Sequence, residues 1–226
     1  MTTQSESLAA VLGRIAEAAR AAGRDPLSIR LVAVSKQQPA TAIRDVAQAG
    51  QHDFGESYTQ EALPKIESLA DLKLTWHFIG RLQGNKTRAV AEHFDWVHTV
   101  DRDRIADRLN EQRPDSLAPL NVCIQVQVTP EPQKAGIPPG EVEALARHIL
   151  GLPRLKLRGL MCIPPAGEPA AVQEDFIALA ELARQLRSKG IDIDSLSMGM
   201  SGDFEPAIAA GSTLVRVGTA IFGERH

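Results

Sequence analysis

The sequence predicts an α/β fold and, within that class, a single (β/α)8 TIM barrel with an extra N-terminal helix. Short apolar runs alternate with longer helix-like stretches along the whole chain, which is typical of parallel strands joined by crossover helices. Eight such runs fit into 226 residues, and α/β barrels of that size are commonly one domain. We therefore expect residues 1–226 to form one barrel domain. An open, doubly wound sheet is the alternative, because periodicity does not show whether a sheet closes.

The chain opens with an amphipathic helix, because Leu8, Val11, Leu12 and Ile15 recur at helical spacing. The segment 23–26, which contains glycine and proline, ends this helix. The apolar runs expected to form the eight strands are, in order, 31–35, 53–56, 75–79, 96–100, 121–128, 157–162, 195–198 and 214–218. The helix-like stretches between them include 40–50, 57–70, 101–112, 141–151 and 171–190.

Composition argues against several classes of protein. The net charge is −3, from 25 basic and 28 acidic residues, so no basic field is available for a nucleic-acid backbone. No apolar run approaches the roughly 18 residues of a membrane span, and the first residues lack the features of a signal peptide. Cys123 and Cys162 lie in apolar runs and are expected to be small buried hydrophobes in a reducing cytoplasm. We expect a cytoplasmic protein without nucleic-acid or membrane partners.

Lys36 ends the first strand and shares a face with Val32 and Val34 at a spacing of two residues. A lysine at this place is most often a solvated strand end. If it points into the mouth of the barrel instead, loss of water would lower its pKa and leave a neutral amine. Such an amine can attack an aldehyde and form a Schiff base.

Two glycine-containing loops follow the last strands. Ser201 and Gly202 follow the seventh strand, and Gly218 and Thr219 follow the eighth. These loops form the usual phosphate site of such barrels, because glycine lets backbone N–H groups approach an oxyanion and the hydroxyls add donors. Turn glycines with capping serine and threonine are the alternative interpretation.

Arg216 lies two residues before Gly218 on the same strand face, within an otherwise apolar run. An arginine in that position needs partners that accept its hydrogen bonds. The partner is either a structural acid or a bound ligand. Two proline-rich loops, 129–140 and 163–169, follow the fifth and sixth strands, on the face where barrels bind ligands. They either contribute to a ligand site or serve as stiff surface connections.

Several familiar motifs are absent. The segment 80–87 approaches a nucleotide-binding P-loop, but Gly84 comes one place early and Asn85 separates it from Lys86. His77 and His98 lie inside strands and are expected to be structural, with no metal site. The absence of G-x-S-x-G removes the simplest hydrolase interpretation.

The combination of Lys36, the two late loops and Arg216 resembles the barrel of fold-type III enzymes that bind pyridoxal 5′-phosphate (PLP), the alanine racemase type. The chain is more closely similar to the pyridoxal phosphate homeostasis protein family. The matching segments run in order over nearly the whole chain: 31-LVAVSK-36, 54-FGESY-58, 76-WHFIGRLQGNK-86, 97-VHTVD-101, Lys134 with Gly136 and Ile137, 158-RGLM-161, 197-SMGMSGD-203 and 210-AGSTLVRVGTAIFG-223.

This resemblance implies a set of cofactor-binding residues. PLP would form an aldimine, a Schiff base, on Lys36, and Arg216 would face the pyridine nitrogen. The phosphate would contact Ser201 and the turn formed by Gly218 and Thr219. Ser57 and Met198 would also lie beside the cofactor. The chain departs from the usual family residues at several positions, which are Ser57 in place of asparagine, Arg81 in place of proline, Gly84 in place of serine and Gly202 in place of an acid. The segment 204-FEP-206 is also unusual for the family.

The resemblance implies a cytoplasmic, monomeric PLP-binding protein that affects vitamin B6 and amino-acid homeostasis and is not an enzyme. PLP-dependent apo-enzymes would be its partners. The alternative is an amino-acid racemase, which needs an acid–base group on each face of the cofactor. We expect no second group, because the only tyrosine, Tyr58, follows the second strand, and no further domain follows the barrel. Arg216 would also keep the ring nitrogen unprotonated. A third interpretation is a PLP-free barrel enzyme that binds a phosphorylated metabolite.

Overall fold

Eight parallel strands form a closed barrel in the computed structural model, which describes residues 3–131 and 135–223. Each strand pairs with the next along the chain, and the last pairs with the first, so the (β/α)8 prediction is confirmed and the open sheet is excluded. The strands are β1 (Arg30–Val34), β2 (Asp53–Glu56), β3 (Thr75–Phe78), β4 (Trp96–Val100), β5 (Leu120–Gln125), β6 (Leu155–Met161), β7 (Ser195–Ser197) and β8 (Leu214–Val217).

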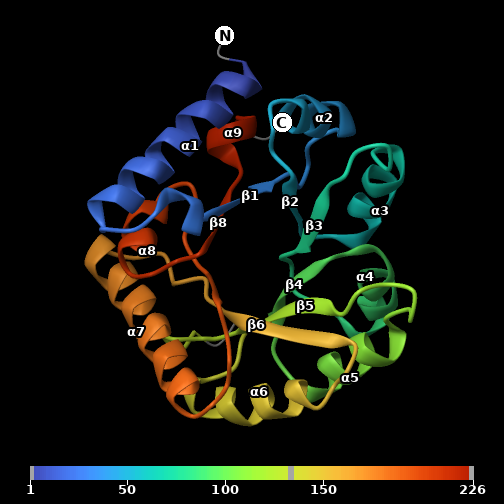
Figure 1. Cartoon of the computed structure of the whole chain (residues 1–226), viewed down its shortest axis with the longest axis vertical. Coiled ribbons are helices and arrows are strands. Elements are labelled where there is room, and N and C mark those ends of the chain that lie inside the picture. The colour runs from blue at the N-terminus through green and yellow to red at the C-terminus, as the bar shows by residue number, and fades with distance from the viewer. Residues whose placement is uncertain (1–2, 132–134, 224–226) are drawn as a thin grey trace.

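Helices surround the barrel (Figure 1). They are α1 (Gln4–Ala21), α2 (Ala40–Gln48), α3 (Thr59–Ser68), α4 (Thr87–His93), α5 (Asp103–Gln112), α6 (Val142–Leu150), α7 (Pro169–Ser188), α8 (Phe204–Ala209) and α9 (Thr219–Phe222). Short 3-10 turns, η1 to η3, lie at Pro26–Ser28, Gly84–Lys86 and Pro139–Glu141. The extra N-terminal helix is therefore confirmed. A capping box between Thr3 and Glu6 starts it, and its apolar face packs against α8 and α9.

The sequence prediction differs from the structure mainly in the short elements and the element ends. Helices α4, α8 and α9 have seven, six and four residues, too few to show a helical period. The predicted strand 121–128 ends at Gln125, because the chain leaves the sheet and only Val126 keeps a single bridge, to Ile137. Strand β6 begins two residues earlier than predicted, at Leu155.

The two faces of the strands have different surroundings. Side chains that point outward pack under the helices in the main core. A smaller apolar cluster fills part of the interior and consists of Val32, Trp96, Cys123, Met161 and Leu214. Both cysteines are buried and free, and burial raises the pKa of each thiol to about 12. They therefore act as small hydrophobes, as predicted.

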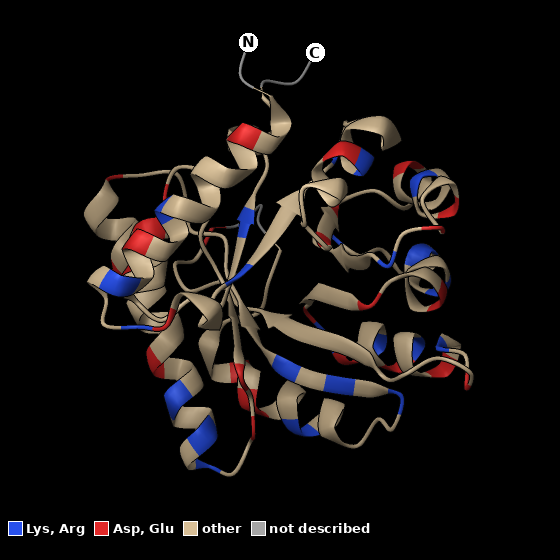
Figure 2. Ribbon diagram, turned by 45° about the horizontal axis from the view of Figure 1, so that its top comes forward, with Lys and Arg blue, Asp and Glu red and all other residues tan. Residues whose placement is uncertain are grey.

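Charged residues of both signs lie mostly on the outer helices and the loops (Figure 2). No described helix combines the length and the apolar character that crossing a membrane requires. Within residues 3–131 and 135–223, no group of three or more acidic, histidine or cysteine side chains could hold a metal ion.

Candidate functional site

A cavity of about 280 Å³ opens where the strands end, on the face that carries the loops after the strands. It is lined by Val34, Lys36, Ser57, Ile79, Ile163, Met200, Ser201, Gly202, Arg216, Gly218 and Thr219. The cavity thus brings together all the predicted site residues except Met198. Met198 is fully buried in the main core, where its N–H donates to the Leu214 carbonyl and its carbonyl accepts from Ser212.

Lys36 lies two residues beyond the end of β1, next to the tightly held Ser35. The Ser35 N–H donates to the Gly55 carbonyl at 2.9 Å, and the Ser35 hydroxyl donates to Glu56 at 2.7 Å. On the other side, Gln37 has a φ of 64°, a left-handed backbone conformation that non-glycine residues rarely adopt. The Gln37 N–H donates to the Glu61 carboxylate, which holds that conformation. Neighbouring groups on both sides therefore fix the backbone that carries Lys36.

A buried ion pair supports the same turn. Lys65, from α3, donates to the Ser35 carbonyl at 3.0 Å and to Glu56 Oε1 at 2.9 Å. Burial raises the pKa of the Glu56 carboxyl, while hydrogen bonds from Ser35 and Lys65 oppose that shift. The second oxygen of Glu56 is buried and has no hydrogen-bond partner among the described residues. Glu56 therefore depends on Lys65 for its charge balance.

The first and last strands meet at the cavity. β8 pairs with β1, with Arg216 opposite Val32 and Val217 opposite Ala33. The backbone at Gly218 also lies close to β1, because a Cβ there would lie 3.0 Å from the Val34 carbonyl oxygen. The close contact favours glycine and brings the turn after β8 beside the strand end that carries Lys36.

Arg216 is 4% exposed and lies at the base of the cavity. It donates to Ser197 Oγ at 2.7 Å and to the Cys162 carbonyl at 3.0 Å. Burial lowers the pKa of its guanidinium. No carboxylate forms an ion pair with it within the described part of the chain, so the structural acid considered from the sequence is not its partner.

This arrangement suits one class of ligand. A primary amine lies on one wall, and Ser201, Thr219 and two glycines lie on the neighbouring turns. A guanidinium lies between them and still has donors to offer. A flat, phosphorylated aldehyde would match all three groups, because its phosphate takes hydroxyl and N–H donors while its carbonyl meets the amine.

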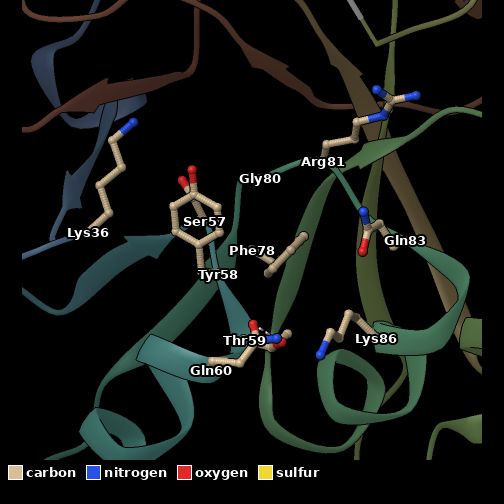
Figure 3. Close-up of a pocket in the computed structure, with 10 residues that line it drawn as sticks. All are labelled: Lys36, Ser57, Tyr58, Thr59, Gln60, Phe78, Gly80, Arg81, Gln83 and Lys86. Carbon is tan, nitrogen blue, oxygen red and sulfur yellow. Dashed lines mark hydrogen bonds between the residues drawn. The ribbon is translucent and has the colours of Figure 1, made fainter.

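A second cavity, of about 440 Å³, lies beside the first, and Lys36 and Ser57 line both. It is lined by Lys36, Ser57, Tyr58, Thr59, Gln60, Phe78, Gly80, Arg81, Gln83 and Lys86. Lys36 and Lys86 lie on opposite sides of this pocket (Figure 3). None of these described lining residues carries a carboxylate. The amine of Lys36 is therefore reachable from a chamber that is polar and basic.

Sequence reasoning missed the residues that support the site. Glu56 and Lys65 each look like one more charge on a strand or helix. Only the position of Lys65, three residues after Ala62 on the buried face of α3, could have indicated its burial. The apolar lining residues Ile79 and Ile163 carry no chemical signal at all. Lys134 lies outside the described residues.

Comparison with known proteins gives consistent matches. A family model described as alanine racemase, N-terminal domain, matches residues 7–226. The pyridoxal phosphate homeostasis protein of Pseudomonas aeruginosa is 56% identical over 226 residues, which is 100% of this chain and 97% of that protein. The protein of the same name from Escherichia coli is 51% identical over 235 residues, covering 100% of this chain and 98% of that one.

Solved structures agree with these matches. The structure of PipY from Synechococcus elongatus with PLP bound has a TM-score of 0.82 and 41% identity, and covers 92% of this chain and 100% of that chain. Alanine racemase from Corynebacterium glutamicum has a TM-score of 0.67 and 18% identity, and covers 96% of this chain but 61% of that chain. At that identity the second likeness shows the fold alone.

Proposed function

We propose a function from the premise that this chain belongs to the pyridoxal phosphate homeostasis protein family, within the wider alanine racemase N-terminal domain family. The chain binds PLP and takes part in the balance of vitamin B6 and amino acids. The observation that carries this proposal is the cavity that unites Lys36, Arg216 and the turns after β7 and β8. A relative of 41% identity has been solved with PLP bound, which supports the same ligand here.

Each part of the ligand has a matching group in this proposal. Lys36 holds the aldehyde carbon as a Schiff base, with loss of water. Ser201, Gly218 and Thr219 take the phosphate, and Arg216 faces the ring nitrogen. Ser57 lies between the two cavities, beside the carbonyl end of the ligand. PLP supplies an electrophilic aldehyde and a ring that can withdraw electrons, and the neighbouring guanidinium limits the second property.

In this proposal the protein binds PLP and does not catalyse a reaction on an amino acid. Racemisation needs a proton donor on the face opposite Lys36. Tyr58 is 59% exposed and lines the second cavity, but it does not line the first cavity, opposite Lys36. PLP-dependent apo-enzymes that receive the ligand, a monomeric state and a cytoplasmic location belong to the same proposal. The open second cavity supports the first of these, because an acceptor amine could reach Lys36 through it.

The test is the visible absorbance of the purified protein and the site of reduction by borohydride. We expect a yellow protein in which borohydride fixes the cofactor mass on the peptide that contains Lys36. Lys36→Ala should stay folded and lose the absorbance, whereas Lys86→Ala, in the adjoining cavity, should keep it. L-alanine in deuterated water should show negligible exchange of its α-proton. An unchanged spectrum in Lys36→Ala would refute the Schiff base, and rapid exchange by the wild type would favour a racemase.

A further inference from the structure

A line of polar side chains, all buried except Asp53, crosses the interior of the barrel and ends at the cavity. Asp53 Oδ1 lies 2.9 Å from His77 Nε2, and His77 Nδ1 lies 2.9 Å from His98 Nε2. His98 Nδ1 lies 2.7 Å from Ser197 Oγ. Arg216 Nη1 donates to that same oxygen at 2.7 Å. One residue each from β2, β3, β4, β7 and β8 thus forms a continuous chain of hydrogen bonds.

The two ends of this chain determine its direction. A guanidinium has only donors, so Ser197 Oγ accepts from Arg216. An ionised carboxylate has only acceptors, so His77 carries its proton on Nε2, toward Asp53. His77 Nδ1 then accepts, and His98 must donate to it from Nε2. The remaining nitrogen of His98, Nδ1, accepts the Ser197 hydroxyl hydrogen.

The opposite direction leaves two groups unsatisfied. Ser197 Oγ would accept from both Arg216 and His98, and its own hydrogen would have no acceptor in the chain. Asp53 would have to carry a proton, although its carboxylate pairs with the Arg30 guanidinium at 3.5 Å. A buried hydroxyl without an acceptor is costly. Only the direction from arginine to aspartate satisfies every member.

We propose that Asp53, His77, His98 and Ser197 are positioning residues that hold Arg216 for contact with the ligand ring. This hydrogen-bond chain gives the Arg216 guanidinium a neutral acceptor, Ser197. It places the balancing carboxylate, Asp53, at the far end of the barrel interior. Arg216 thereby keeps its full charge and its remaining N–H groups for the cavity. This inference rests on the proposed function, because the ring of PLP is what the arginine would face.

Burial supports the same assignment. His77, His98 and Ser197 have no exposed surface. Burial lowers the pKa of both histidines, so both stay neutral as the chain requires. The charged and titratable groups that act on the two rings are Asp53, Arg30 and Asp95 for His77, and His77 and Arg216 for His98. The stacking of His77 on Trp96, with ring centres 5.5 Å apart, further fixes its ring plane.

The first test needs no ligand. Long-range 15N–1H correlation spectra of the full-length apo-protein report the tautomer and the charge of each imidazole. We expect both rings as neutral Nε2–H tautomers that do not titrate near pH 6.5, the ordinary value for histidine. An Nδ1–H tautomer in either ring, or titration near that pH, would overturn the proposed chain. This result does not depend on whether the protein binds PLP.

The second test separates positioning from simple packing. Glutamine at position 98 can accept from Ser197 through its carbonyl and donate to His77 through its amide, whereas leucine can do neither. We expect His98→Leu to weaken PLP binding by about tenfold to a hundredfold, as for a lost hydrogen bond near a charged group, and to shift the cofactor absorbance. His98→Gln should restore both properties to within about threefold.

A folded His98→Leu protein with wild-type affinity and spectrum would overturn the proposal. If His98→Leu does not fold, Ser197→Ala removes the acceptor of Arg216 with less loss of volume, and the same losses are expected. The outcome is distinct from failure of the proposed function. If the proposed function fails, the wild type itself will not retain PLP. The tautomer measurement will still decide whether the hydrogen-bond chain exists.

Discussion

Lys65 is a second lysine beside the site, and its role differs from that of Lys36. Its side chain is 9% exposed, and its ammonium holds the buried Glu56 carboxylate and the Ser35 carbonyl together. Lys65→Met would leave Glu56 buried without a cation, a kind of change that costs about 3–5 kcal/mol. We expect that loss in the free energy of unfolding of the apo-protein, measured with denaturant.

The matched control for Lys65 is Lys73, which is exposed. Lys73→Met should change stability by no more than about 0.5 kcal/mol. The double variant Lys65→Met with Glu56→Leu should recover part of the loss, because neither charge then remains buried. Equal stability of Lys65→Met and wild type would show that the Glu56 carboxyl is already neutral in the folded protein.

At the scale of single residues, the sequence predicted the polar groups that end or follow a strand. Lys36 and Ser201 follow apolar runs and Arg216 interrupts one, so their place along the chain was visible. The supports were less visible. Lys65 pairs with Glu61 at helical spacing, but its contacts with Glu56 of β2 and with the Ser35 carbonyl follow from no short-range pattern. His77 and His98 were expected to be satisfied core histidines, and their hydrogen bonds confirm this.

Gly80, two residues beyond β3, packs closely against the segment between β2 and α3 and accepts a hydrogen bond from β4. A Cβ on Gly80 would lie 2.1 Å from the Ser57 carbonyl oxygen, and Thr99 on β4 donates to the Gly80 carbonyl at 2.7 Å. Gly80→Ala must therefore displace the segment between β2 and α3. We expect it to destabilise the fold by about 1–3 kcal/mol, as for overpacking, and to weaken PLP binding through Ser57.

Gly84 provides the comparison for that variant. A Cβ there meets only the Arg108 side chain, at 4.0 Å. Gly84→Ala should therefore keep wild-type stability and ligand affinity. Thermal unfolding and titration with PLP measure both properties. Wild-type behaviour of Gly80→Ala would mean that the Ser57 segment moves freely and does not position the ligand.

Buried strands and long helices could be predicted from the sequence, whereas the shortest helices could not. Parallel strands buried on both faces read as apolar runs, and each of the eight predicted runs overlaps a strand. The long α7 shows its period over several turns, whereas α8 and α9 are shorter than two turns. Their places depend on packing against α1, which local sequence does not encode.

The whole molecule should lose stability in mild acid. Burial lowers the folded-state pKa of His77 and His98, while the unfolded chain protonates histidine near pH 6.5. Below that pH the unfolded state binds more protons, so stability present at neutral pH is lost as the pH falls. Each histidine adds a slope of up to about 1.4 kcal/mol per pH unit.

Glu56 acts in the opposite direction. Its raised pKa means that the folded state holds a proton more readily, so this contribution is fully present in acid and is lost as the pH rises through the folded value. Denaturant unfolding of the apo-protein and of His98→Gln at several pH values between about 7.5 and 5.5 isolates the effect of His98, because both proteins contain Glu56. The loss of stability on acidification should be smaller in His98→Gln. Equal slopes in the two proteins would contradict the burial of a neutral His98.

The barrel closes along one seam, where the first strand meets the last, and the proposed ligand would bridge that seam. It would be attached after β1 at Lys36 and gripped after β8 by Gly218 and Thr219. A ligand bound in this way would link the end of β1 to the end of β8 and stabilise the closed barrel. Each tenfold rise in free ligand above its dissociation constant adds about 1.4 kcal/mol to the folded state, so the midpoint of thermal unfolding should follow ligand concentration. The thermal stability of the protein would then depend on the concentration of free PLP in the cell.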